Sequence, residues 1–321
     1  MNFGDAVVAF LNIGLFSSLV SRFTGANTAI FVFCSLLYLG CEPVETVGIM
    51  LTYLVFMRLT IYTQKKKLNF KHLQVFKGYK VFVPVFFIIV SLFIYPFAAL
   101  AIFLLLFMTE ILAQMWDDVP EDKRASRGQI TGWVAAGSIL TTLSMIAVKF
   151  IPEDFYYIIG GIAAFLICVF FYWLGQDRDR LSGIWDKIVL LSFIPLGLFG
   201  FDLADWLDDM RRHVNSTLIA YNLPFIFLPV FFIGFIMANI LFGIFSLSGL
   251  VITFFGALGL RLFGYYEMSR KGKANLVSLG FTVLAILLLL ITAPEPTGVS
   301  KAVDAFLPSN HYGFTGILNM F

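Results

Sequence analysis

Charged side chains are scarce in this sequence: Asp, Glu, Lys and Arg make up only 13% of its 321 residues. Average soluble domains carry about 25%. Hydrophobic residues account for 60% of the chain, and phenylalanine alone occurs 38 times. A single soluble domain of this length has no core large enough to bury so many apolar side chains. We therefore expect an all-α, polytopic integral membrane protein whose main partner is the lipid bilayer.

Side chains that bind metals are also few, with three histidines and three cysteines. No pair of them has a spacing typical of metal ligands, so we expect no metal and no cofactor. Cys34, Cys41 and Cys168 lie in apolar runs and are interpreted as packing residues. The net charge of +2 is too small to indicate a nucleic-acid partner. The sequence has no phosphate-binding G-x-x-x-x-G-K-[ST] motif, so we expect no nucleotide-driven transport.

Apolar segments recur along the chain, and a spanning helix needs about 20 such residues. We expect about eight full spans and two broken or re-entrant segments. The candidate segments are residues 5–22, 27–41, 43–62, 81–96, 97–114, 129–149, 155–175, 188–201, 214–240, 241–262 and 275–293.

Most of the 22 basic residues lie between these segments, in residues 63–80, 115–128, 176–187, 202–213 and 263–274. The positive-inside rule assigns all five stretches to the cytoplasm. For both ends of the segment before residue 202 to be cytoplasmic, that segment has to enter the membrane and return. We expect a multi-pass protein of the cell membrane, which is the inner membrane if the chain is bacterial.

This topology has internal symmetry, with two sets of segments in opposite orientation. We interpret residues 1–115 as a first transmembrane repeat and residues 186–293 as a second, inverted one. Residues 116–185 form a connecting cytoplasmic linker and helix pair, and residues 294–321 form an extracytoplasmic tail. Inverted repeats with paired broken helices are typical of secondary transporters.

Polar residues interrupt the first apolar region at "SRFTGANTAIFVF", residues 21–33. Irregular backbone is tolerated at membrane depth only where it is buried in protein or lines a cavity. A helix that resumes near Asn27 points its N-terminus, the positive end of its dipole, at the gap and favours an anion there. An ordinary loop outside the membrane, followed by a plain helix cap, is the alternative. The predicted first half of an anion site consists of Arg22, Thr24, Gly25, Ala26, Asn27 and Thr28.

The second half of the predicted site follows a weaker break at Gly200–Asp202. Its candidate contacts are Asn215, Ser216, Thr217 and Asn222, although a cytoplasmic helix start capped by asparagine would explain the first three equally well. Coupling to a proton or to sodium requires a carboxylate, for which Glu45 and Asp202 are the candidates; acids in water at the membrane interface are the alternative. We expect Arg58 to extend to the interface; a counter-charge for an anion is the alternative.

Two longer stretches carry a family resemblance. The first, residues 23–73, has the break "TGANT", the turn "GCEP" and the basic loop ending "LNFKHL". The second, residues 251–290, contains "GALGLR" at the start of a closing helix pair. Together they resemble the TauE/SafE sulfite exporter family. The resemblance implies a permease for sulfite, thiosulfate, sulfoacetate or another sulfonate, with the anion bound between broken helices at mid-membrane.

Two other classes of function stay open. A membrane-embedded lipid-modifying enzyme would need clustered His, Asp or Glu residues at a membrane face, and "DLADWLDDMRRH", residues 202–213, is the available cluster. Its spacing matches no familiar catalytic pattern, and we interpret it as an amphipathic helix on the inner membrane surface. A structural subunit of a membrane complex is the other alternative. The leading prediction is a transporter without enzymatic activity.

Overall fold

The computed structural model describes residues 13–19, 28–38, 41–66, 82–176, 178–210, 218–242 and 252–259. Within these ranges every regular element is a helix. Four stretches are long and apolar enough to cross a membrane, namely Pro43–Tyr62, Phe97–Asp117, Arg127–Val148 and Tyr221–Phe242. The prediction of a helical membrane protein is thus confirmed in its coarse form, whereas eight spans and an inverted repeat stay predictions.

The helices follow the apolar segments closely because the sequence marks their ends. Pro96 occupies the first turn of its helix, where its missing N–H is not needed. Ser126 accepts a hydrogen bond from the Gln129 N–H, and the Gln129 side chain accepts one from the Ser126 N–H, which is a capping box. The helices are α2 (Thr28–Tyr38), α3 (Pro43–Lys66), α4 (Phe82–Ile94), α5 (Pro96–Asp117), the 3₁₀ turn η4 (Glu121–Lys123), α6 (Arg127–Val148), α7 (Glu153–Gln176), α8 (Arg178–Leu191), α9 (Phe193–Phe199), α10 (Ala204–Met210) and α11 (Leu218–Phe242). Residues 13–19 and 252–259 are also helical.

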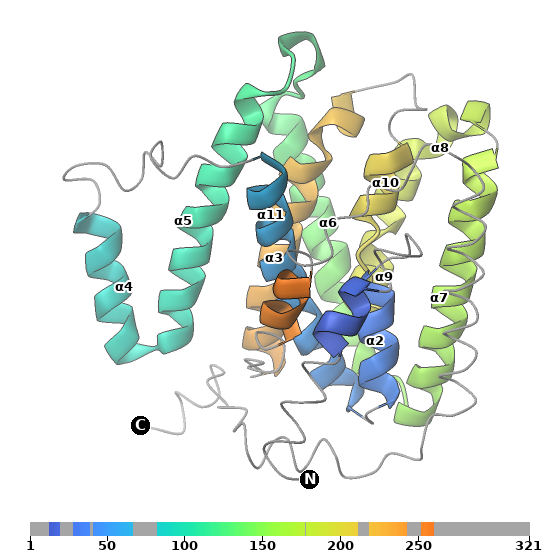
Figure 1. The fold of residues 1–321 in the computed structure, drawn as a ribbon, viewed down its shortest axis with the longest axis horizontal. Coiled ribbons are helices and arrows are strands. Elements are labelled where there is room, and N and C mark those ends of the chain that lie inside the picture. The colour runs from blue at the N-terminus through green and yellow to red at the C-terminus, as the bar shows by residue number, and fades with distance from the viewer. Residues whose placement is uncertain are drawn as a thin grey trace.

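Helices α3, α6 and α11 form the centre of the bundle, where α11 packs against both of the others (Figure 1). α3 and α11 run in opposite directions, as the connections to their ends show. The α4–α5 hairpin lies on one side of this centre, while α2 and α7 to α10 lie on the other. α4 has 13 residues, or about 20 Å of helix, which is shorter than a hydrocarbon core of about 30 Å.

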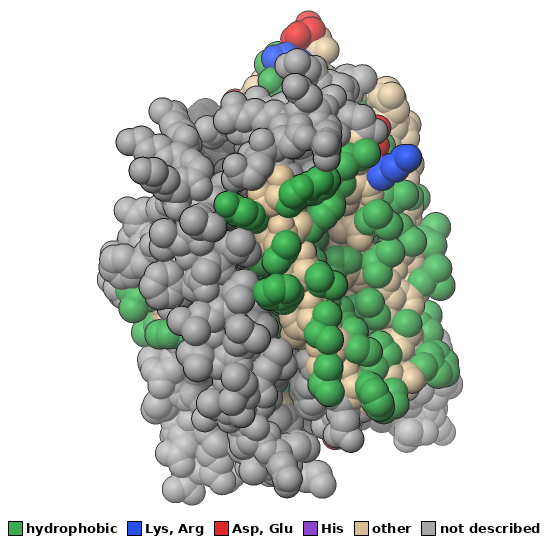
Figure 2. All heavy atoms as spheres, turned by 90° about the vertical axis from the view of Figure 1, so that its right-hand side faces the viewer, with side chains coloured by type: hydrophobic (Ala, Val, Ile, Leu, Met, Phe, Trp, Pro, Cys, Tyr) green, Lys and Arg blue, Asp and Glu red, His purple; other side chains and the backbone are tan. Residues whose placement is uncertain are grey.

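Apolar side chains cover much of the surface that the structure describes. Figure 2 shows hydrophobic residues spread over the described part of one face, with charged residues at its upper tip and a few more on its upper right side. On α7, at the edge of the bundle, the exposed side chains include Ile162, Leu166 and Trp173. A large contiguous apolar surface is unusual for a protein dissolved in water and is expected where lipid is the solvent.

The chain reverses direction between α9 and α10. α8 starts at the end of the bundle where α7 ends, α9 continues toward the middle, and α10 returns toward that same end (Figure 1). This path is the one expected for a segment that enters a membrane and returns. The apolar residues Leu203, Trp206 and Leu207 are buried, and Trp206 contacts Phe171 of α7. The apolar face of α10 therefore packs against protein, and the expectation of a helix lying on the membrane surface is wrong.

Candidate functional site

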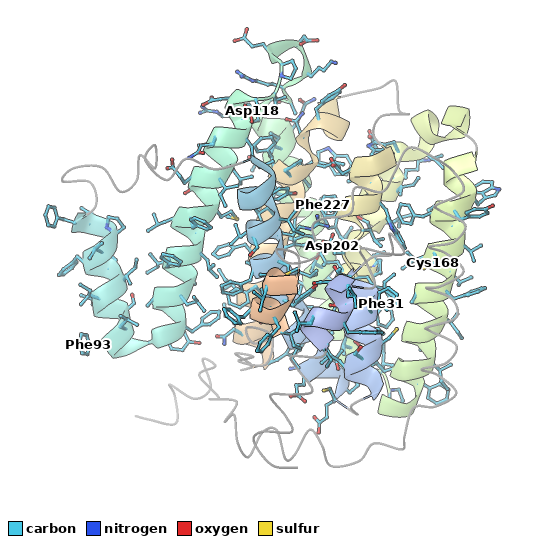
Figure 3. All side chains as sticks on the ribbon, viewed as in Figure 1. Phe31, Phe93, Asp118, Cys168, Asp202 and Phe227 are labelled. Atoms are coloured by element: carbon cyan, nitrogen blue, oxygen red, sulfur yellow. The ribbon has the colours of Figure 1, made fainter. Side chains whose placement is uncertain are left out.

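A buried ion pair joins Arg58 of α3 to Asp202, which follows the end of α9. The Arg58 Nε and Nη2 groups both contact Asp202 Oδ2. The two side chains are only 4% and 5% exposed, and Figure 3 shows Asp202 well between the two ends of the helices. Contrary to expectation, Arg58 is buried in protein instead of extending to the membrane interface, and the burial of Asp202 excludes the alternative of an acid in water. Charges inside a membrane protein are expensive to bury, so a buried pair is a functional-site candidate.

The backbone turn at Gly200 brings Asp202 to Arg58. Gly200 ends α9 with a φ of 69°, a left-handed conformation that glycine adopts without strain. A Cβ atom on Gly200 would lie 2.2 Å from the Cβ atom of Met50, so the backbone of the turn packs directly against α3 and leaves no room for a side chain. The other carboxylate oxygen of Asp202, Oδ1, accepts a hydrogen bond of 2.8 Å from the Ala204 N–H at the start of α10. Both oxygens of Asp202 are thus held by donors.

Hydroxyl groups lie beside this ion pair. Tyr53, on α3, is buried, and its hydroxyl interacts with the side chains of Thr28 and Ser17 and with the charges of Asp202 and Arg58. The Tyr53 hydroxyl itself has no hydrogen-bond partner among the described residues. We call Ser17, Thr28, Tyr53, Arg58 and Asp202 the polar cluster. Thr28 is the first residue of α2, so the positive N-terminal end of α2 lies at this cluster.

Aromatic side chains fasten α2 to the end of α9. The Phe33 ring of α2 meets the rings of Phe199, Phe201 and Tyr156 edge-on, with centroid distances of 5.7, 4.7 and 6.1 Å. The Tyr156 hydroxyl of α7 donates a hydrogen bond of 2.8 Å to the Leu198 carbonyl. This carbonyl belongs to the last turn of α9, where the carbonyl groups have no backbone N–H partner within the helix. α2, which follows the first predicted break, and the end of α9 are therefore packed together.

We expect Tyr156→Phe to lower the free energy of unfolding by about 1 kcal/mol, because the Leu198 carbonyl loses its donor while the ring packing is kept. The measurement is denaturant unfolding of the purified protein. Tyr221→Phe is a suitable control, because the Tyr221 side chain is exposed. Equal stability of the Tyr156→Phe variant and the parent would show that this hydrogen bond does not hold the last turn of α9.

The structure describes only some of the predicted site residues. Thr28 and Asp202 belong to the polar cluster. Glu45 is a partly exposed residue in the first turn of α3, about 20 Å along the helix axis from Arg58. Eight of the predicted site residues lie outside the described residues, namely Arg22, Thr24, Gly25, Ala26, Asn27, Asn215, Ser216 and Thr217.

Asn222 lies near the start of α11 and contacts the connection between α5 and α6. Its side-chain amide donates a hydrogen bond of 2.9 Å to the Lys123 carbonyl. The Lys123 ammonium group in turn contacts the Tyr221 hydroxyl at 3.1 Å, and this hydrogen bond raises the pKa of Lys123. The hydrogen bond from Asn222 to Lys123 therefore attaches this loop to α11, and the predicted role of Asn222 in substrate binding stays a prediction.

Sequence reasoning gave too little weight to Arg58 and did not select Tyr53 or Ser17. One signal was present: an arginine inside an apolar segment, matched by an acid directly after a glycine turn elsewhere in the chain. A buried arginine needs a counter-charge, so the two residues were natural partners. Glu110 of α5 is a further buried acid, 5% exposed, and it accepts a hydrogen bond from Gln114.

Among the residues that the structure describes, no group of three or more His, Cys, Asp or Glu could hold a metal ion. Cys34, Cys41 and Cys168 are buried, free thiols. Comparison of the chain with protein-family models, curated proteins and solved structures gave no match. Fold and site together define a helical membrane protein with a buried ion pair beside helix ends, and the resemblance to the TauE/SafE family stays a prediction from the sequence.

Proposed function

We propose that this chain is a secondary transporter of the cell membrane for small anions, with sulfur-containing oxyanions and sulfonates as its substrate class. The observation that carries the proposal is the buried Arg58–Asp202 pair, which lies where the turn after α9 meets α3, beside the N-terminus of α2. The buried positive charge of Arg58 would attract a small anion and offset part of the free energy needed to remove that anion from water.

The chemistry of the polar cluster suits an oxyanion. A guanidinium group presents several N–H donors in one plane and matches the oxygens of a carboxylate, phosphate or sulfonate. The Thr28 hydroxyl and the first N–H groups of α2 add donors from another direction. A sulfonate has three oxygens and could accept from both sets at once. The proposed role of residues 22–27 is to complete this site, since they directly precede Thr28.

The helix arrangement supports transport by alternating access. α3 and α11 pack against each other in opposite directions. In the proposed inverted repeat, these would be equivalent helices of the two halves. Transporters of this kind expose a site at the repeat interface to one side of the membrane and then to the other. The family resemblance in the sequence favours the same class of substrate.

Two substitutions test the site. We expect Thr28→Val, which replaces a hydroxyl by a methyl group of the same shape, to weaken anion binding about 10- to 100-fold, since hydrogen bonds to charged groups contribute about 1.5–3 kcal/mol. Asn27→Ala is expected to abolish uptake in the same way. The measurement is thermal shift of the purified protein with sulfite, thiosulfate, sulfonates and carboxylates, followed by uptake into proteoliposomes, because a ligand of the folded state raises its stability.

Thr131→Val is the matched control, because Thr131 lies exposed on α6 and its hydroxyl donates a hydrogen bond to the Arg127 carbonyl of the same helix. Normal expression together with unchanged uptake by both site variants would exclude residues 27 and 28 from the site. Lack of stabilisation by every anion tested would contradict the proposed function itself.

A further inference from the structure

We propose that Asp202 couples anion transport to protons: when it takes up a proton it releases Arg58, which then binds the anion. This inference rests on the proposed function and adds a coupling ion and a mechanism at the same site. It starts from the geometry of the pair, in which one oxygen of Asp202 occupies the donors of Arg58 and the other accepts from the Ala204 N–H.

An anion that binds Arg58 has to take the place of the Asp202 carboxylate. If Asp202 stayed charged, the site would then hold two negative groups beside one guanidinium group, in a place where both side chains of the pair are almost fully shielded from solvent. A buried charge without its partner is strongly unfavourable. Protonation relieves this: one anion enters, one proton forms an O–H bond on Asp202, and no other covalent bond changes. For a monovalent anion the net charge of the site stays the same.

The surroundings of Asp202 favour a proton over sodium as the coupling ion. The charged or titratable groups that face it from α3 are Arg58 and Tyr53, and α2 contributes the neutral Thr28. Tyr156 of α7 packs against Phe199 nearby, and its hydroxyl donates to Leu198. A sodium ion at Asp202 would sit beside the guanidinium group and the Ala204 N–H, which both repel a cation. A proton adds to the carboxylate without needing further oxygen ligands.

The direct test measures protons in the wild-type protein. Full-length protein in lipid nanodiscs is titrated with methanesulfonate, whose own charge does not change from about pH 5 to about pH 8. We expect uptake of about one proton per anion bound, and a Kd that rises about tenfold for each unit of pH above the pKa of Asp202. The sign follows from the mechanism, because binding needs the protonated form and weakens as pH rises.

Asp202→Asn is the matching variant. The asparagine oxygen still accepts from the Ala204 N–H, but the side chain neither carries a charge nor takes up a proton. We expect methanesulfonate to bind this variant with a Kd that is independent of pH and without proton uptake. In proteoliposomes, the wild-type protein should carry the anion together with a proton and move no net charge. The Asp202→Asn variant should carry the anion alone and therefore move net charge. Asp122→Asn, in the exposed η4 turn, is the control and should keep the wild-type pH dependence.

The outcomes separate this inference from the proposed function. Binding of methanesulfonate to the wild-type protein without proton uptake, or sodium-dependent binding instead, overturns the coupling role and leaves the anion site intact. A Kd for methanesulfonate that still rises with pH in the Asp202→Asn variant overturns the coupling role as well. Absence of binding by methanesulfonate, sulfite, thiosulfate and carboxylates at every pH overturns the proposed function, and the coupling role with it. If the Asp202→Asn variant does not fold, the number of protons that the wild-type protein takes up per anion bound decides whether transport is coupled to protons.

Discussion

Arg58→Met is expected to abolish anion binding and to lower the free energy of unfolding by about 3–5 kcal/mol. The stability loss arises because the buried Asp202 loses its partner and has either to carry an unpaired charge or to take up a proton. Methionine fills the volume of the arginine stem, so lost packing contributes little. The measurements are denaturant unfolding in detergent micelles and thermal shift with methanesulfonate.

The double variant Arg58→Met, Asp202→Asn separates stability from function. Removing both charges leaves no unpaired ion, and replacing a buried pair by neutral residues is often neutral or stabilising. We therefore expect the double variant to regain most of the lost stability while anion binding stays absent. A double variant that regained binding would show that Arg58 is not the anion's counter-charge, and the pair would then be purely structural.

Arg58→Lys adds a graded comparison. Lysine keeps the positive charge but lacks the planar set of donors that matches an oxyanion. We expect it to bind methanesulfonate more weakly than the wild type and more strongly than Arg58→Met. Equal binding by the Lys variant and the wild type would mean that charge alone, without guanidinium geometry, holds the anion.

The fold was predictable where composition and helix ends decide it. The apolar segment beginning at Pro43 is a continuous helix, and the turn before Pro96 and the capping box at Ser126 delimit their helices as local rules require. α8 was not anticipated, because "RDRLSGIWDKIVLL" is a basic stretch whose mean polarity suggested a loop. Several of its apolar residues are nonetheless buried, namely Trp185, Ile188 and Val189, so tertiary packing decides its structure.

The candidate site was predictable only in part, since its defining contact joins residues far apart in the chain. A glycine break and an adjacent acid pointed to Asp202, and a helix start after a polar stretch pointed to Thr28. The inward direction of Arg58 could not be read from the sequence. A long side chain near a membrane boundary usually extends to water, and only the packing of Gly200 against Met50 shows that a carboxylate arrives there instead.

Gly200→Ala is expected to be the most disruptive small substitution in the second break, with a loss of about 2–5 kcal/mol in unfolding free energy. Alanine at a φ of 69° is strained, and its Cβ atom would lie 2.2 Å from that of Met50, which is rigidly attached to the α3 backbone. The turn would have to move away from α3 and carry Asp202 with it. We therefore also expect weaker anion binding and a changed pH dependence in whatever fraction folds.

A matched pair of variants isolates the two causes of this loss. Gly128→Ala introduces the same methyl group at the start of α6 with no atom within 4 Å, and we expect a change of less than about 1 kcal/mol. Met50→Gly, measured with and without Gly200→Ala, forms a double-mutant cycle: in the Met50→Gly background the clash between Cβ atoms is gone but the backbone strain is kept, so Gly200→Ala should cost less there than in the parent. If Gly200→Ala were as stable as Gly128→Ala, the chain after α9 could not cross α3 at this point, and neither the ion pair nor the site built on it would hold.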